Sequence, residues 1–197
     1  MSCAAAILAG GKATRMGGRA KSFLVVDAER VIDRQLAVLR PLFSEILIVA
    51  NDPGPYEPLG LPVFADVVPG GFGPLVGILT ALESAKADRV VCVACDMPFL
   101  AKAPLAFVRD HAADAEVAVP MVRGREEPLF ARYAKSVAPA IRAQIAGGDY
   151  KVSRFYANVR TARIDEAILR VIDPDLRFLA NVNTPEDLTS LPPPPRR

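Results

Sequence analysis

The feature that most constrains the fold is the first run of the chain, from Cys3 to Ala9, which is apolar throughout. A strand with no polar position has no face to offer to water, so both of its faces must be covered. Strands of this kind are typical of parallel sheets that carry helices on both sides. The rest of the chain must therefore supply helices for two outer layers.

Further apolar runs alternate along the chain with segments of helical periodicity. Strands are predicted at residues 23–26, 46–50, 63–65, 89–94, 117–120, 128–133 and 159–164, and an extended piece at 177–182. Helices are predicted at residues 29–43, 74–83, 103–111 and 137–146, with a last one beginning at Thr184. This alternation predicts an α/β fold of three layers around a mainly parallel sheet.

Length and charge limit the classes of protein to which the chain can belong. Its 197 residues fit a single domain, assigned to residues 1–191, followed by an exposed proline-rich tail at 192–197. The hydrophobic fraction of 51% indicates a real core. A formal net charge of +2 argues against nucleic acid as a partner and favours a small anion. No apolar stretch of about 20 residues is present, so no membrane span is expected.

The chain has three cysteines, Cys3, Cys92 and Cys95, and the last two are expected to be buried structural thiols. The number of cysteines is odd and no signal peptide precedes them, which predicts a reducing, cytoplasmic location. Cys92 and Cys95 have the C-x-x-C spacing of zinc and redox sites, but they lie in a predicted strand. Residues three apart on a strand point to opposite faces, so the two thiols are not expected to share a metal.

A glycine-rich, basic loop follows the first strand, at residues 10–21. Its glycines allow backbone N–H groups to approach a ligand, and its basic residues, Lys12, Arg15, Arg19 and Lys21, suit phosphate oxygens. The spacing matches neither the Walker loop nor the dinucleotide-binding fingerprint. The loop is interpreted as another kind of phosphate site, with a simple surface turn as the alternative.

The predicted parallel strands end at Gly10 with its basic loop and at three polar residues, Asn51, Asp66 and Asp96. The carboxyl ends of such strands share one edge of the sheet, where ligands bind. Asp96 directly follows a buried strand and, with phosphates nearby, would suit Mg²⁺, which usually takes one or two carboxylates plus phosphate oxygens. The alternatives are that Asp96 caps the following segment and that Asp66 belongs only to a turn.

Several motifs give the chain a resemblance to the molybdenum cofactor guanylyltransferases. They are Leu8–Gly11, Arg15–Gly17 with Lys21, Gly73–Ile78, Cys95–Pro98, Glu127–Tyr133 and Asn181–Leu188. The resemblance implies a Rossmann-like nucleotidyltransferase fold and transfer of GMP from GTP to the terminal phosphate of molybdopterin, with release of pyrophosphate. Its implied partners are these two substrates, with transient contact to cofactor-assembly proteins or molybdoenzymes.

The same resemblance implies roles for individual residues. GTP would be bound by Leu8, Ala9, Gly10, Lys21, Asn51, Asp66 and Asp96. Lys21, Arg15 and Asp96 would be catalytic, with Lys21 on the phosphates and Asp96 on Mg²⁺ together with the nucleotide. Asn51 and Asp66 would lie on the nucleoside side of GTP. The family usually reads Arg-Met-Gly-x-Asp-Lys, whereas this chain has Ala20 before Lys21 and one extra residue. The support that an aspartate would give to Lys21 is therefore missing.

Other polar residues have weaker assignments. Asn181 and Asn183 lie on one side of an extended piece and could reach the metal or the acceptor, or simply form a turn. Lys151 and Arg154 could bind the anionic pterin or begin a solvated helix. His111, the only histidine, is expected at the surface, in a predicted helix away from the strand ends. This suits a reaction that needs no general base. The alternative functions are a nucleotidyltransferase using CTP or a sugar phosphate, and a non-catalytic nucleotide or pterin carrier.

Overall fold

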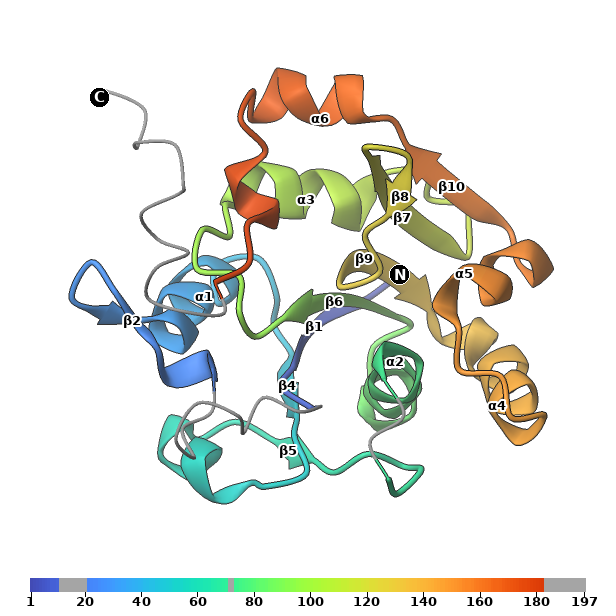
Figure 1. Ribbon diagram of the computed structural model, residues 1–197, viewed down its shortest axis with the longest axis horizontal. Helices are drawn as coiled ribbons and strands as arrows, with labels where there is room; N and C mark the ends of the chain where they lie inside the picture. Colours follow the sequence, from blue (N-terminus) through green and yellow to red (C-terminus); the bar gives the residue numbers. More distant parts are fainter. Residues whose placement is uncertain (11–20, 71–72, 183–197) are drawn as a thin grey trace.

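The computed structural model describes residues 1–10, 21–70 and 73–182, and centres on one mixed sheet (Figure 1). The strand order is β10-β7-β9-β6-β1-β4-β5, with β8 paired to β7 outside this path. The bounds are β1 (Cys3–Leu8), β4 (Ile46–Val49), β5 (Val63–Phe64), β6 (Arg89–Ala94), β7 (Val117–Val122), β8 (Arg125–Glu126), β9 (Phe130–Ala134) and β10 (Thr161–Ile164). The apolar first strand, β1, thus lies inside the sheet, as its composition requires.

Most neighbouring strands are parallel, as predicted. In the register of β1, Leu8 lies opposite Val49 of β4 and Ala94 of β6, so these three strands end at one edge. Along the main path of the sheet β9 is the exception, because it runs antiparallel to both β6 and β7, and outside that path β8 is antiparallel to β7. The start of β9 therefore lies beside the end of β6, where Phe130 pairs with Val93.

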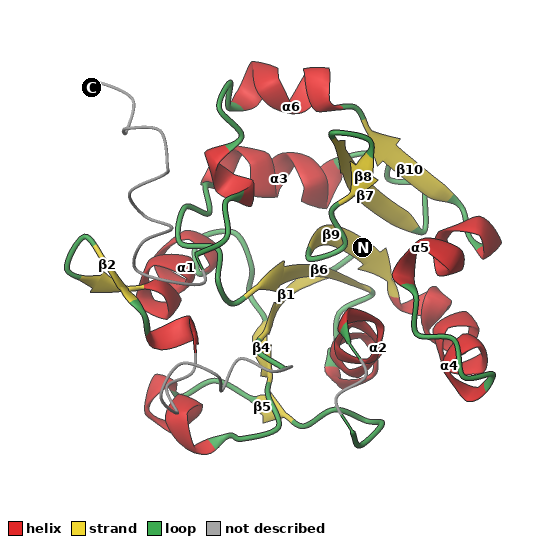
Figure 2. Ribbon diagram, in the orientation of Figure 1, coloured by secondary structure: helices red, strands yellow, loops and turns green. Residues whose placement is uncertain are grey.

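Helices cover both faces of the sheet (Figure 2). One face carries α1 (Val31–Leu39), α3 (Lys102–Asp110) and α6 (Glu166–Ile172), and the other α2 (Pro74–Ser84), α4 (Ala138–Ala146) and α5 (Val152–Phe155). Alternate residues of β1 enter the two cores, Ala6 on the side of α2 and Ile7 on the side of α1. The three-layer α/β architecture predicted from the sequence is confirmed.

Two predicted extended segments are wrong in part. Residues 21–23 form the 3₁₀ helix η2 (Lys21–Phe23), and only Val25–Val26 is a strand, β2, in a hairpin with β3 (Glu29–Arg30). The hairpin turn at Asp27 and Ala28 has positive φ angles of 50° and 66°, and it delays the start of α1 to Val31. These positions lack the glycine that usually signals such a turn.

The second partial error is at residues 177–182, which begin with the 3₁₀ helix η6 (Arg177–Leu179). This turn directs Phe178 into the core, where its ring lies 4.8 Å from that of Phe130. α5, α6 and the 3₁₀ helices η3 (Gly54–Leu59), η4 (Lys135–Val137) and η5 (Tyr156–Asn158) are additional short elements. The helix predicted from Thr184 and the tail at 192–197 lie outside the described residues.

The predicted burial of the C-x-x-C thiols on opposite faces of the sheet is confirmed. Cys92 belongs to the core beneath α2 and Cys95 to the core beneath α1. Burial raises the pKa of Cys95 to about 11 and that of Cys92 further still. Both are free thiols and stay protonated near neutral pH, in keeping with a structural role.

Two other expectations concern the helices. His111 directly follows α3 and packs its partly exposed ring 4.9 Å from that of Phe107. No helix in the described part of the chain combines the length and apolar character needed to cross a membrane.

Candidate active site

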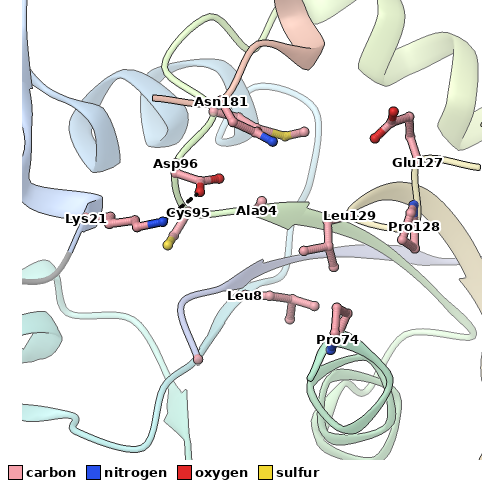
Figure 3. A pocket seen from close by; sticks show the side chains of 12 residues that line it. Leu8, Lys21, Pro74, Ala94, Cys95, Asp96, Glu127, Pro128, Leu129 and Asn181 are labelled. Atoms are coloured by element: carbon pink, nitrogen blue, oxygen red, sulfur yellow. Dashed lines mark ion pairs between the residues drawn. The ribbon is translucent and has the colours of Figure 1, made fainter. Parts of the chain in front are cut away.

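A cavity of about 400 Å³ opens at the edge of the sheet where β1 and β6 end. Leu8 and Ala94, the last residues of these strands, form its floor, and Asp96 stands two residues beyond β6. Lys21 reaches the same space from η2, with its Nζ 3.6 Å from Oδ2 of Asp96 (Figure 3). The structure thus brings together Lys21 and Asp96, two of the three predicted catalytic residues.

The position of Asp96 is fixed by hydrogen bonds to backbone on both sides of it. The buried Gln35 of α1 donates from Nε2 to the carbonyl of Ala94 at 2.8 Å and to that of Met97 at 3.0 Å. The backbone N–H of Val182 donates to the carbonyl of Asp96 itself at 2.8 Å. The carboxylate is therefore held on a well-supported turn, without its own side chain being used for that support.

The Asp96 carboxyl is electrostatically unusual. Burial raises its pKa, and the Lys21 ammonium opposes that shift. Its Oδ1 is buried and has no hydrogen-bond partner among the described residues. A buried acceptor without a partner is costly, so this oxygen is suited to a ligand that is bound during function.

Gly10, Asn51 and Asp66 form a second group at the same edge. Asn51 donates from Nδ2 to Oδ2 of Asp66 at 2.9 Å, and its Oδ1 accepts the backbone N–H of Asp66 at 2.9 Å. A side chain at Gly10 would begin 3.5 Å from Oδ2 of Asp66. Oδ1 of Asp66 is buried and, within the described chain, has no hydrogen-bond partner. The predicted nucleoside-binding residues are therefore neighbours.

A narrower cavity of about 150 Å³ lies between this group and α2. It contains Asp66 and Gly77, and it shares Leu8, Gly10 and other wall residues with the larger cavity. Gly77 has no side chain to fill this space, and a Cβ there would already lie 3.4 Å from Leu8. The two cavities form adjoining compartments, one mostly apolar and the other containing the Lys21–Asp96 pair.

The first turn of α2 borders both compartments. Pro74 is the first residue of the helix and lines both cavities, while Gly73 precedes it with a φ of 91° that suits glycine. Gly73, as the N-cap residue, offers no side chain to cap this helix N-terminus. Its backbone N–H groups and positive dipole end favour an anion at this position.

The opposite wall comes from residues that strand-end reasoning did not select. Glu127, Pro128 and Leu129 precede β9 and line the larger cavity, as Figure 3 shows. They reach the cavity because β9 is antiparallel to β6, so that the start of β9, and not its end, lies at this edge of the sheet. Ala94, at the end of β6, donates its N–H to the carbonyl of Leu129 at 3.0 Å. The signal in the sequence was the turn at Arg123 and Gly124, which reverses the chain between β7 and β8.

The remaining predicted residues are less directly placed. Ala9 extends β1 by donating its N–H to Val49 at 2.8 Å, and Asn181 lines the larger cavity. Lys151 and Arg154 are exposed, line neither cavity, and Arg154 forms an ion pair with Asp149 at 3.1 Å. Their assignment to the pterin stays a prediction. Arg15 and Asn183 lie outside the described residues.

The geometry agrees with comparisons to known proteins. The MobA-like NTP transferase domain matches residues 5–164. The probable molybdenum cofactor guanylyltransferase of Carboxydothermus hydrogenoformans is 39% identical over 94% of this chain and 93% of its own. The molybdenum cofactor guanylyltransferase of Shewanella woodyi is 33% identical over 95% of this chain and 94% of its own.

Solved structures give the same result for the fold. Molybdopterin-guanine dinucleotide biosynthesis protein A from Archaeoglobus fulgidus superposes with a TM-score of 0.78 at 26% identity, covering 95% of each chain. The 2-C-methyl-D-erythritol 4-phosphate cytidylyltransferase from Thermus thermophilus has a TM-score of 0.68 at 20% identity, covering 96% of this chain and 97% of its own. The predicted nucleotidyltransferase fold is confirmed.

Proposed function

Since the chain belongs to the MobA-like NTP transferase family, we propose that it transfers GMP from GTP to the terminal phosphate of molybdopterin and releases pyrophosphate. Relatives named as guanylyltransferases of this cofactor, 33–39% identical over more than nine-tenths of the chain, support the choice of substrates. The structural observation that carries the proposal is the Lys21–Asp96 pair beside the end of β1. It provides a cation and a carboxylate where a triphosphate and its metal must meet.

The guanine nucleoside is assigned to the narrower compartment. Leu8 and Val49 give it apolar walls, and Asp66 gives it an acceptor oxygen without a partner in the described chain. Asn51 orients that carboxylate through its hydrogen bond to Oδ2. A carboxylate oriented in this way can accept the N–H groups of guanine or the hydroxyls of its ribose.

The triphosphate is assigned to the junction of the two compartments. Lys21 supplies positive charge there, and the first turn of α2 supplies backbone N–H groups and a positive dipole end. Arg15, in the glycine-rich loop, is proposed as a further contact to the phosphates. Together these groups offset the negative charge that otherwise keeps two phosphate-bearing substrates apart.

Asp96 fits the ligation of a divalent cation, for which Mg²⁺ is proposed. Its buried Oδ1 without a partner in the described chain is an available oxygen ligand, and the amide of Asn181 lines the same cavity. Within residues 1–10, 21–70 and 73–182 no group of three His, Cys, Asp or Glu side chains could hold a metal alone. This matches Mg²⁺, which prefers one or two carboxylates plus phosphate oxygens and water. When bound, the ion supplies positive charge to the phosphate oxygens.

The reaction asks for alignment more than for proton transfer. An oxygen of the acceptor phosphate forms a bond to the α-phosphorus of GTP, the bond from that phosphorus to the α–β bridging oxygen breaks, and pyrophosphate leaves. The attacking oxygen is already anionic, so no general base is needed. Lys21 and the turn that carries Asp96 hold the reacting groups in place, which lowers the entropic part of the barrier.

The test is pyrophosphate release from GTP, ATP and CTP, each with molybdopterin, with Mg²⁺ and with excess EDTA. We expect pyrophosphate release with GTP but not with ATP or CTP, and we expect excess EDTA to abolish it. Exclusive use of CTP would replace the proposal by a cytidylyltransferase. GTP binding without turnover would instead indicate a carrier.

A cytoplasmic location and contact with assembly proteins or molybdoenzymes are further proposals, which co-purification from intact cells would test.

A further inference from the structure

Glu127 lines the larger cavity but is not among the residues proposed to bind GTP or Mg²⁺. In the described part of the chain its carboxylate has no hydrogen bond or ion pair, although the charge of Arg125 acts to lower its pKa. Its neighbour Glu126 is different, because it forms an ion pair with Arg163 at 3.3 Å and lines neither cavity. The chain thus uses one of two adjacent carboxylates for structure and leaves the other open.

Glu127 is held in place by its backbone and not by its side chain. Its N–H donates to the carbonyl of Pro120 at 3.0 Å, and its own carbonyl accepts the N–H of Phe130 at 3.1 Å. The side chain is half-buried, and burial raises its pKa. A partly desolvated carboxylate on a fixed turn gains most from ligand N–H groups that restore its hydrogen bonds.

The position of Glu127 separates it from the donor nucleotide. Figure 3 shows Lys21 and Asp96 on one side of the cavity and Glu127 with Pro128 on the other. Glu127 does not line the narrower compartment, to which the nucleoside is assigned. With the triphosphate at Lys21 and Asp96, the space against Glu127 is left for the acceptor.

We propose that Glu127 recognises the pterin ring of the acceptor and so selects the acceptor substrate. This inference rests on the proposed function. The pterin of molybdopterin carries a 2-amino-4-oxopyrimidine edge, which presents two N–H donors side by side to one carboxylate. Guanine presents the same edge, so the site must hold two such rings. Asp66 in the narrower compartment and Glu127 in the larger one provide one carboxylate for each.

The first test compares Glu127→Gln with Glu126→Gln, its matched control one position away. Glutamine keeps the shape but loses the charge and one acceptor, so the KM for molybdopterin should rise about 10- to 100-fold, the range typical of hydrogen bonds to a charged group. The KM for GTP and the Mg²⁺ requirement should change less than about twofold, and Glu126→Gln should leave all three unchanged.

Different results would overturn the assignment in recognisable ways. A raised KM for GTP in Glu127→Gln would place the guanine, not the pterin, against this carboxylate. A raised Mg²⁺ requirement would make it a metal ligand. If the wild type is active and Glu127→Gln has the same KM for molybdopterin, Glu127 takes no part in acceptor recognition.

A second test needs no turnover and so separates this inference from the proposed function. Fluorescence titration would measure binding of 6-hydroxymethylpterin and of 6-hydroxymethyllumazine, which has a 2-oxo group in place of the 2-amino group. We expect the wild type to prefer the pterin and Glu127→Gln to lose that preference. Equal or absent binding of both rings by the wild type contradicts the inference. Pterin preference without GMP transfer would sink only the proposed function.

Discussion

The two ends of β6 each carry an aspartate, and the two are treated differently. Asp88, before the strand, accepts hydrogen bonds from the N–H and Oγ of Ser2 at 3.0 and 3.2 Å, and these bonds lower its pKa. Asp96, after the strand, has its pKa raised by burial and has an Oδ1 without a partner in the described chain. One end of the strand uses its carboxylate to hold the fold together, and the other leaves it available.

The same contrast holds elsewhere in the molecule. Away from the cavities, Asp110 pairs with Arg109 and Glu166 with Arg170, and both acids have lowered pKa values. Substituting carboxylates at the cavity edge should therefore cost activity with little loss of stability, while substituting those that are paired away from the cavities should do the reverse.

The largest effect is expected from Asp96→Asn. The substitution keeps the size of the side chain but removes the charge opposite Lys21, so kcat should fall about 100- to 1000-fold, the cost typical of losing one preorganised electrostatic group. Stability should stay close to that of the wild type, because the backbone bonds from Gln35 and Val182 remain.

Steady-state pyrophosphate release and thermal unfolding would measure both quantities for Asp96→Asn. The exposed Asp114→Asn serves as the control for a generic loss of charge. Near-normal turnover in Asp96→Asn would remove this residue from the mechanism.

Lys21→Met should reduce kcat/KM for GTP about 10- to 100-fold, because a charge-assisted contact to phosphate is lost. Lys135→Met, at a lysine outside both cavities that donates to the carbonyl of Ala85, is the matched control. GTP titration by calorimetry alongside the kinetics would check the assignment. Unchanged GTP affinity and unchanged turnover together would contradict a role for Lys21 at the phosphates.

Gln35→Met should lower both stability and activity, because Gln35 is a buried residue that supports the turn carrying Asp96. It leaves the buried carbonyls of Ala94 and Met97 without their side-chain donor, which should lower the free energy of unfolding by about 2 kcal/mol. The loosened turn at Asp96 should also lower kcat several-fold while the KM for GTP changes little. Loss of stability with wild-type kcat would show that Gln35 serves the core alone.

The smallest effect is expected from Asp88→Asn, which should lower the melting temperature slightly at neutral pH and leave turnover unchanged. The folded-state pKa of Asp88 lies below its ordinary value of 3.8. Its stabilisation is therefore present above pH 3.8 and is lost as the pH falls through the folded-state value. The melting difference between the variant and the wild type should shrink over that acid range; a difference independent of pH would refute the charge-based explanation.

Sequence reasoning located the parallel half of the site because one rule governs it. An apolar strand followed by a polar residue places that residue at the carboxyl edge of the sheet, which correctly grouped Gly10, Asn51, Asp66 and Asp96. The bounds of β6, Arg89–Ala94, were also predicted without error. Local periodicity and composition were sufficient for these features.

The antiparallel half was not accessible in the same way. The apolar pattern of residues 128–133 predicts a strand but not its direction, so Glu127 could not be assigned to the cavity edge. Gln35 looked like part of an amphipathic helix, and its bonds to residues 59 and 62 positions away depend on tertiary packing. The hairpin turn at Asp27 and Ala28 was missed because its positive φ angles occur without glycine.

The place of β1 in the middle of the sheet has a consequence for how a newly made chain acquires its cavity. Synthesis produces β1 first, but Leu8 pairs with Val49, 41 positions later, and with Ala94, 86 positions later. At ~5–20 residues per second, β1 waits roughly 4–17 s for its second partner. The floor of the cavity is therefore completed only after nearly half the chain has been synthesised, and until then this apolar strand is exposed to pairing with other chains.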